Sequence, residues 1–134
     1  MEKETLKRIF DFLEEKGEHN APLLWKLKND IPLIEEDLNV KGDLDFKNVK
    51  ITSLPEGLKV GDYLDLTGLP ITSLPEGLKV GSGLYLSHTS ITSLPEGLEV
   101  GGRLFIENTP LKKYTDEELR EMVKPGFIKG KIKR

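Results

Sequence analysis

The residues that most often carry chemistry in enzymes are few and scattered in this sequence. Its two histidines, His19 and His88, lie far apart in different contexts. His88 falls at a position where other parts of the chain have Asn48, Gly68 and Asn108, residue types that are typical of turns. We therefore interpret His88 as a turn residue rather than a catalytic one. The chain has no cysteine, which excludes disulfides, thiolate metal sites and cysteine nucleophiles.

One stretch resembles a calcium-binding loop without completing it. Asp37, Asn39 and Gly42 match positions 1, 3 and 6 of an EF-hand loop. Position 5, however, is Lys41, a cation where an oxygen ligand is required, and position 12 is Asn48 instead of a bidentate glutamate. We predict no metal site here.

Carboxylates recur in two columns, and paired carboxylates could serve glycoside hydrolysis. These columns are Glu56, Glu76 and Glu96, and then Asp45 and Asp65. A repeated surface acid is explained equally well by duplication of a sequence unit. The chain also lacks the nucleophile elbow, the phosphate-binding loop, the dinucleotide-binding fingerprint and the zinc-protease motif. We therefore predict a protein that is not an enzyme and has no cofactor.

A repeat of 20 residues organises the middle of the chain. The octapeptide ITSLPEGL occurs at 51–58, 71–78 and 91–98, and leucine and valine columns continue the same register on either side. Each repeat contains a Leu-x-Leu pair whose period of two predicts a short strand. One repeat cannot bury its own apolar side chains, whereas stacked repeats can. The sequence thus predicts an α+β, β-rich solenoid of about four to five coils, with parallel strands at 44–46, 64–66, 84–86 and 104–106.

Glycines recur at two fixed places in each repeat. Gly61, Gly81 and Gly101 precede the strand, and Gly57, Gly77 and Gly97 lie in the return segment. Such repetition indicates either a turn that needs a positive φ or a close approach of two backbones. The sequence alone leaves both explanations open for each column.

The two ends of the chain predict helices that cover the open coils. Residues 2–16 have the apolar spacing of an amphipathic helix, and residues 21–28 predict a second short one. Thr115 and Glu118 form a capping-box pattern before a short helix at 116–123. We therefore divide a single structural domain into an N-terminal helical cap (1–30), a solenoid (31–111), and a C-terminal cap helix with a basic tail (112–134). The tail is interpreted either as a solvated end or as an anchor for acidic groups.

The repeat resembles the short, 20-residue type of bacterial and phage leucine-rich repeat, which carries a similar T-S-L-P segment. The resemblance covers residues 31–111 and implies a non-catalytic protein-binding scaffold. That family usually has asparagine where this chain has Val49, Leu69, Thr89 and Thr109. An asparagine ladder is therefore absent, and threonine could replace part of it in two coils. In ubiquitin-ligase effectors with such repeats a separate cysteine-bearing domain is catalytic, so that activity is not carried over.

The residues between the buried leucines form the candidate binding surface. Strand alternation places them on the outer face, where they differ from coil to coil while the scaffold positions repeat. Tyr, Phe and Arg are enriched at interaction hot spots, and acids could supply a polar rim. The predicted partner-binding residues are Tyr63, Tyr85, Arg103, Phe105, Asp45 and Asp65.

Composition narrows the class of partner. The net charge of −3 argues against nucleic acid, and no stretch is apolar enough to predict a membrane span. The charged N-terminus has no apolar signal core, so we expect a cytoplasmic protein, with delivery into a host cell as the alternative. We predict a protein–protein interaction module, an adaptor or inhibitor that binds a protein partner. The alternative is a structural component of a larger assembly, such as a phage or surface particle.

Overall fold

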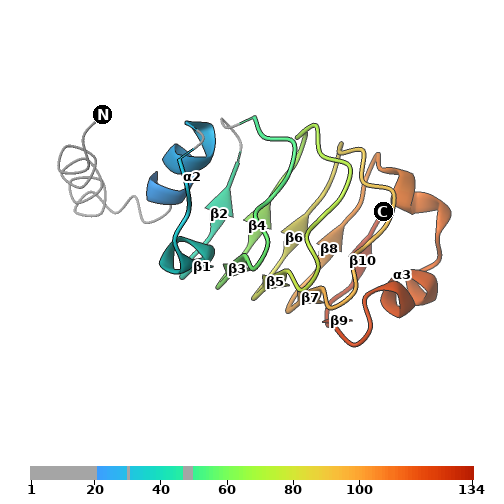
Figure 1. Ribbon diagram of the computed structural model, residues 1–134. Coiled ribbons are helices and arrows are strands. Elements are labelled where there is room, and N and C mark those ends of the chain that lie inside the picture. The colour runs from blue at the N-terminus through green and yellow to red at the C-terminus, as the bar shows by residue number, and fades with distance from the viewer. Residues whose placement is uncertain (1–20, 30, 47–49) are drawn as a thin grey trace.

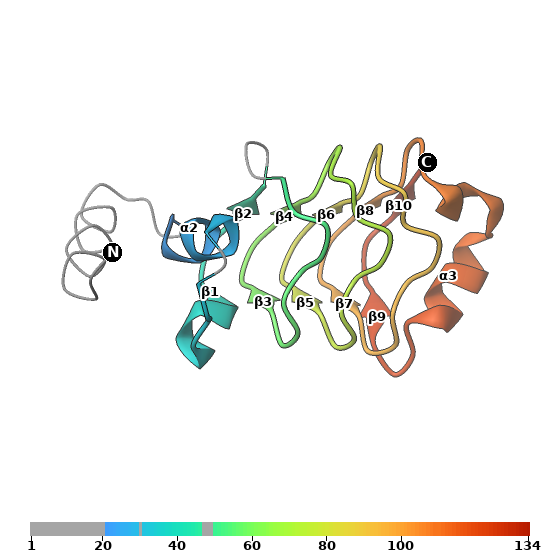
Figure 2. The ribbon, with the colours of Figure 1, turned by 45° about the horizontal axis from the view of Figure 1, so that its top comes forward.

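The computed structural model describes residues 21–29, 31–46 and 50–134. These residues form a parallel β-solenoid in which two five-stranded sheets run along the stack of coils (Figure 1, Figure 2). The predicted fold class, a β-rich repeat solenoid with parallel strands and short helices, is confirmed. The helix predicted at residues 2–16 lies outside the described residues.

One sheet, called sheet B here, contains the strands that the Leu-x-Leu pairs predicted. Its strands pair in register at successive repeats, so that Leu44, Leu64, Leu84 and Leu104 follow one another. Strand order is β10-β8-β6-β4-β2. The bounds are β2 (Leu44–Asp45), β4 (Leu64–Asp65), β6 (Leu84–Tyr85), β8 (Leu104–Phe105) and β10 (Ile132–Lys133).

A second sheet, sheet A, was not predicted from the sequence. It is built on the valine column, whose members pair in register from Val40 to Val100 and then with Ile128. Strand order is β1-β3-β5-β7-β9. The bounds are β1 (Asn39–Val40), β3 (Lys59–Val60), β5 (Lys79–Val80), β7 (Glu99–Val100) and β9 (Phe127–Ile128).

Three regular coils of 20 residues separate β2, β4, β6 and β8. A fourth, longer coil runs from Leu104 to its partner Ile132, 28 residues later, and carries the C-terminal helix. The predicted number of about four to five coils is therefore slightly higher than the number of regular ones. The solenoid also continues past residue 111, where the prediction ended it.

The leucine columns form the core between the two sheets. Leu64, Leu66, Leu84, Leu86 and Leu104 are fully buried. Each side chain lies beside its equivalent in the next coil, because the strands are in register. Burial of one such side chain stabilises the fold by about 1.5–3 kcal/mol, so the stack is held together by contacts between coils.

Glycine is required in the two columns for different physical reasons. A Cβ on Gly81 would lie 2.1 Å from the carbonyl oxygen of Gly61, and one on Gly101 would lie 2.2 Å from that of Gly81. This column is therefore glycine because coils approach closely. Gly57, Gly77 and Gly97 instead have φ values of 82°, 73° and 76°, which side chains rarely adopt. Each of the two predicted explanations thus applies to one column.

The turns after β4, β6 and β8 also need a left-handed residue. Gly68, His88 and Asn108 have φ values of 77°, 60° and 54°, which confirms that His88 is a turn residue. Next to them, the hydroxyl of Thr89 donates to the carbonyl of Leu86 at 2.6 Å, and Thr109 makes the equivalent bond to Ile106 at 2.7 Å. These two buried threonines stand at positions where the leucine-rich-repeat family usually has asparagine, and each binds a turn carbonyl.

The N-terminal end is covered by helix α2 (Ala21–Lys28) and the 3-10 turn η1 (Glu35–Leu38), as the prediction for residues 21–28 required. Leu23 of α2 is 3% exposed and belongs to the core. Lys26 pairs with Asp37 at 2.7 Å, and this carboxylate also accepts a hydrogen bond from the Ile34 N–H. Asp37, one of the calcium-loop residues considered above, is therefore engaged in holding α2 onto the first coil.

The C-terminal end consists of the 3-10 turn η2 (Pro110–Lys113), helix α3 (Asp116–Met122) and the strands β9 and β10. The predicted capping box is present, with Thr115 and Glu118 each bonding the other's backbone N–H. The interpretation of the tail as a solvated end is wrong, because its residues add one strand to each sheet. Ile128 and Ile132 are buried at 5% and 8% exposure.

Arg120 of α3 closes the last coil. Within the stack, the carbonyl of Val100 accepts from Lys129, and that of Gly102 accepts from Gly130. In the last coil the Arg120 guanidinium takes the place of a further coil. It donates to the carbonyl of Gly130 at 2.8 Å and to that of Ile128 at 3.4 Å. An open strand edge is thereby blocked against pairing with another chain.

Candidate interaction face

The outward side chains of sheet B form a surface that we call the strand face. Because buried leucines alternate with outward residues, two columns of side chains run across the five strands. The first column is Asp43, Tyr63, Gly83, Arg103 and Lys131; the second is Asp45, Asp65, Tyr85, Phe105 and Lys133. All six residues predicted as partner-binding lie on this face.

Three aromatic rings occupy the centre of the strand face and contact one another. The Tyr85 and Phe105 rings stack with centroids 4.4 Å apart and an interplanar angle of 3°. Tyr63 meets Tyr85 edge to face at 5.8 Å and 78°. All three are half-buried rather than exposed. The rings therefore cover part of one another's surface. Among the described residues, the large hydrophobic side chains that stand exposed are Ile34 and Phe127, elsewhere on the molecule.

Gly83 shows how the ring of Tyr85 is accommodated. A Cβ on Gly83 would lie 3.3 Å from Cε2 of Tyr85, closer than most real contacts of this kind. Gly83 is itself buried although it belongs to an outward column. The ring therefore lies over the glycine, and a larger residue there would push the ring away from its stack.

Carboxylates form one end of the strand face, on β2 and β4. Asp43 accepts a hydrogen bond from the Tyr63 N–H at 3.3 Å, and Asp65 accepts one from the Thr67 N–H at 3.0 Å. Asp45 is exposed beside them. The negative charge of Asp43 raises the pKa of the Tyr63 phenol above its ordinary value, with further contributions from desolvation, Asp45 and Asp65.

Cations form the other end, on β8 and β10. Arg103, Lys131 and Lys133 are all exposed. Sequence reasoning identified only Arg103, because Lys131 and Lys133 belong to the tail. A signal was present: Ile128 and Ile132 are four residues apart, as are Val100 and Leu104, which form the strands they pair with.

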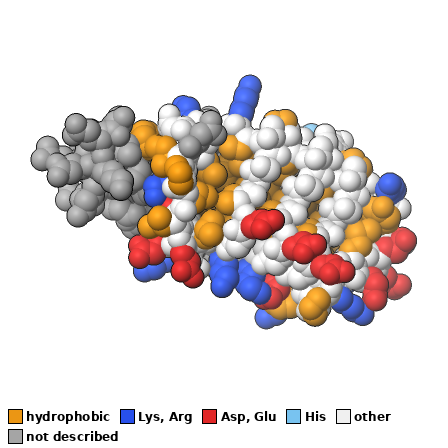
Figure 3. Space-filling view, in the orientation of Figure 1, with side chains coloured by type: hydrophobic (Ala, Val, Ile, Leu, Met, Phe, Trp, Pro, Cys, Tyr) orange, Lys and Arg blue, Asp and Glu red, His pale blue; other side chains and the backbone are white. Residues whose placement is uncertain are grey.

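The opposite side of the molecule carries the return segments, which repeat without variation. Figure 3 shows this side, with surface that is neither charged nor hydrophobic along the coils and acidic groups in a row across them. Its exposed residues are Thr52, Ser53, Thr72, Ser73, Thr92 and Ser93, with Glu56, Glu76 and Glu96. A shallow hollow here is lined by Ser53, Glu56, Ser73 and Glu76 among others.

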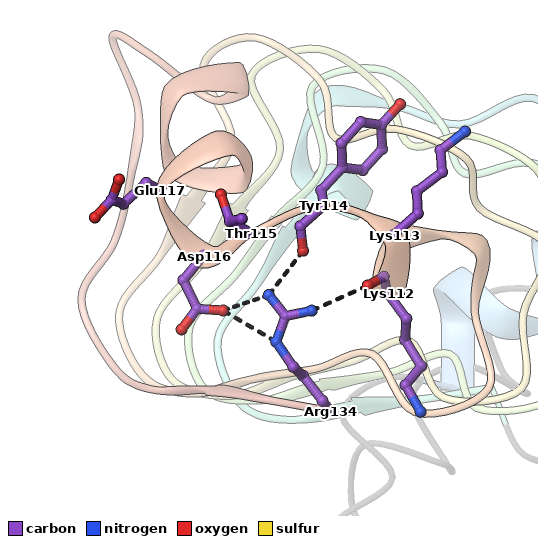
Figure 4. Close-up of a pocket in the computed structure, with 7 residues that line it drawn as sticks. All are labelled: Lys112, Lys113, Tyr114, Thr115, Asp116, Glu117 and Arg134. Carbon is purple, nitrogen blue, oxygen red and sulfur yellow. Dashed lines mark hydrogen bonds and ion pairs between the residues drawn. The ribbon is translucent and has the colours of Figure 1, made fainter.

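A second hollow near the C-terminus is occupied by an arginine of the chain itself (Figure 4). The Arg134 guanidinium donates to the Asp116 carboxylate at 2.6 Å and to the carbonyls of Tyr114 and Lys112 at 2.8 and 3.2 Å. These bonds fasten the last residue to the start of α3. The hollow therefore explains how the tail is held.

The described residues contain no cluster of metal-ligating side chains. His88 contacts Asn108 through its Nδ1 at 3.3 Å, and His19 lies outside the described part of the chain. Among the described residues, no three histidine or carboxylate side chains gather in a group that could hold a metal ion. In the same residues, no helix is both long enough and apolar enough to cross a membrane.

Comparison of the chain with protein-family models, with curated proteins and with solved structures finds no match to any of them.

Proposed function

We propose that this chain is a non-catalytic protein-interaction module of the leucine-rich-repeat kind, an adaptor or inhibitor whose strand face binds a protein partner. The observation that supports this proposal is a contrast between two sides of each coil. The return segment is identical in three coils, whereas the outward residues of sheet B differ from coil to coil, apart from the pair Asp45 and Asp65. Those variable residues nevertheless form one contiguous row of acids, aromatic rings and bases.

The chemistry of the strand face suits a protein partner better than a carbohydrate. Sugars bind to open faces of aromatic rings, whereas Tyr85 is stacked against Phe105 and contacted by Tyr63. Tyrosine, phenylalanine and arginine surrounded by charged residues make the composition of a protein-binding hot spot with a polar rim. The rings are held in place by one another, so little conformational entropy is lost when a partner binds.

The proposal is tested by affinity capture with the full chain as bait in an extract of its source organism, followed by mass spectrometry. Changing Tyr85 and Phe105 to alanine should weaken capture of the partner by about thirtyfold or more, since truncation of a central anchor costs at least about 2 kcal/mol. A matched control changes Thr72 and Ser73, exposed on the return side, to alanine.

Folding must be checked in parallel, because the lost ring contacts also cost stability, about 0.5–1.5 kcal/mol. Arg103→Glu removes an exposed side chain and leaves the stack intact, so it provides a second face variant that should fold normally. Full capture by folded versions of both face variants would contradict the proposal.

A structural role in a larger particle is the second candidate. Its support is the return side, where identical threonine, serine and glutamate side chains stand exposed in three successive coils, a regularity that suits a repetitive lattice. In that case the control variant Thr72→Ala/Ser73→Ala would lose its partner while the strand-face variants kept it.

A further inference from the structure

The charged residues of the strand face are arranged so that the face is complementary to a second copy of itself. From β2 to β10 the first column reads acid, tyrosine, glycine, arginine, lysine, and the second reads acid, acid, tyrosine, phenylalanine, lysine. Acids therefore lie at one end, cations at the other, and aromatic rings between them. Asp43, Asp45 and Asp65 balance Arg103, Lys131 and Lys133, so the face has no net charge in these two columns.

A surface of this kind can meet a second copy of itself about a twofold axis. If the axis lies in the interface along β6, the central strand of sheet B, each column faces the same column of the other copy in reverse order. The pairs that result are Asp43 with Lys131, Asp45 with Lys133, Tyr63 with Arg103, Asp65 with Phe105, and Tyr85 with Tyr85. An axis along the stack of coils would instead place acids on acids, which is unfavourable.

Most contacts produced by the first axis are chemically favourable, and the exception is Asp65, which faces Phe105. The two ends of the interface pair carboxylates with ammonium groups. Beside the centre, the Arg103 guanidinium would meet a tyrosine ring, a cation–π combination. A third column, two residues further along the strands, contains Thr67 and Glu107. There the Glu107 carboxylate would face the Thr67 hydroxyl, which can donate a hydrogen bond to it. No like charges are brought together in these columns.

The ends of the solenoid favour this face over end-to-end stacking. Arg120 already binds the carbonyls of the last coil, and α2 packs onto the first. We propose, on the basis of the protein-binding role of the strand face proposed above, that its partner is a second copy of this chain, bound face to face about a twofold axis along β6.

The dimer is expected to be weak and sensitive to salt. The five strands of sheet B span four intervals of about 4.8 Å, or about 19 Å, so the contact is narrower than a standard specific interface. The exposed ion pairs at its ends are screened when the Debye length falls from about 10 Å at 0.1 M to about 3 Å at 1 M salt. Association should therefore be visible at high protein concentration and low salt, and should decrease as salt is added.

Charge reversal at the two ends tests the arrangement directly. Analytical ultracentrifugation of the full chain, at concentrations up to about 1 mM, measures the dissociation constant. Asp45→Lys places lysine against Lys133 at both ends of the dimer, and Lys133→Glu places glutamate against Asp45. Either variant alone should associate at least about tenfold more weakly than the unchanged chain, since two attractions become two repulsions.

Recombining the two changes should restore association. In an equimolar mixture of the single variants, both end contacts are attractive again, and the same holds for the double variant Asp45→Lys/Lys133→Glu. Controls with the same change in net charge lie on other surfaces: Glu76→Lys on the return side and Lys59→Glu on sheet A, both exposed. These controls should associate as the unchanged chain does.

Three results would overturn the inference: a monomer at all concentrations in low salt, assembly beyond two copies, or no rescue by the double variant and the mixture. The capture experiment described above separates this failure from failure of the proposed function. If the chain is monomeric but its face variants still lose a different protein, the strand face binds a heterologous partner.

Discussion

Replacing Gly81 by alanine would insert a methyl group between two coils whose backbones are already in contact. The new Cβ would lie 2.1 Å from the carbonyl oxygen of Gly61 and 2.8 Å from its carbonyl carbon, whereas real Cβ atoms essentially never approach below 3.0 Å. Both obstructing atoms belong to the backbone, so no side chain can move out of the way. The coils would therefore have to separate by about 1 Å.

Such a separation acts on the hydrogen bonds that join the coils in sheet A. The Gly81 N–H donates to the carbonyl of Val60 at 2.8 Å, and the Lys79 N–H donates to that of Leu58 at 3.4 Å. Stretching both by about 1 Å takes them out of hydrogen-bond range. Two lost bonds cost about 2 kcal/mol, and overpacking adds about 1 kcal/mol or more. We expect the free energy of unfolding to fall by about 3 kcal/mol.

Gly42→Ala is the matched control for this substitution. Gly42 lies in the equivalent turn of the first coil, has no left-handed φ, and would place its Cβ where no atom lies within 4 Å. Its free energy of unfolding should stay within about 0.5 kcal/mol of the unchanged chain, or rise slightly. Urea unfolding followed by far-ultraviolet circular dichroism measures both. An unchanged midpoint for Gly81→Ala would refute the close-approach explanation, and equal losses in the two variants would show a general need for glycine.

Two further predictions concern the last coil and the acidic end of the strand face. Arg120→Met removes the donors to the carbonyls of Ile128 and Gly130. We expect the free energy of unfolding, measured by thermal unfolding, to fall by about 1–3 kcal/mol, and light scattering at high concentration to increase. Unchanged behaviour in both experiments would refute the edge-blocking role. Nearby carboxylates raise the pKa of Tyr63, so the folded state holds the phenol proton more tightly than the unfolded state does. The resulting contribution to stability is present below the ordinary pKa of 10.0 and is lost as the pH rises through the pKa of the folded state. Asp43→Asn should lower that pKa toward 10.0 in an absorbance titration at 295 nm, and no change would mean that Asp43 is not its main cause.

The sequence predicted the strands of sheet B well because two leucines on one face of a short strand leave a clear alternation. It did not predict sheet A, although buried Leu58 and Val60 flank outward Lys59 with the same period of two as the leucines of sheet B. The signal for these strands was therefore present in the sequence. The last coil was missed because α3 lengthens it from 20 to 28 residues, which breaks the repeat spacing that identified the others.

The positions of the candidate-site residues on sheet B could be predicted from the sequence, whereas the exposure of their side chains could not. Strand alternation correctly placed Tyr85 and Phe105 on the outer side of sheet B. Whether such rings stand exposed depends on side-chain rotamers, which the spacing of residues does not determine. Gly83 was the available signal, since an absent side chain in an outward column leaves room for the neighbouring Tyr85 ring.

The order of charges on the strand face is not the order that would stabilise a single chain. In a parallel ladder, neighbouring residues of one column lie about 4.8 Å apart, so like charges on adjacent strands repel. Asp45 nevertheless pairs in register with Asp65, and Lys131 lies beside Arg103 at the other end. Alternating acids and bases along each column would turn both repulsions into attractions without touching the core. Segregated charges therefore lower the stability of the isolated chain slightly, and opposite charges on a binding partner would offset that cost.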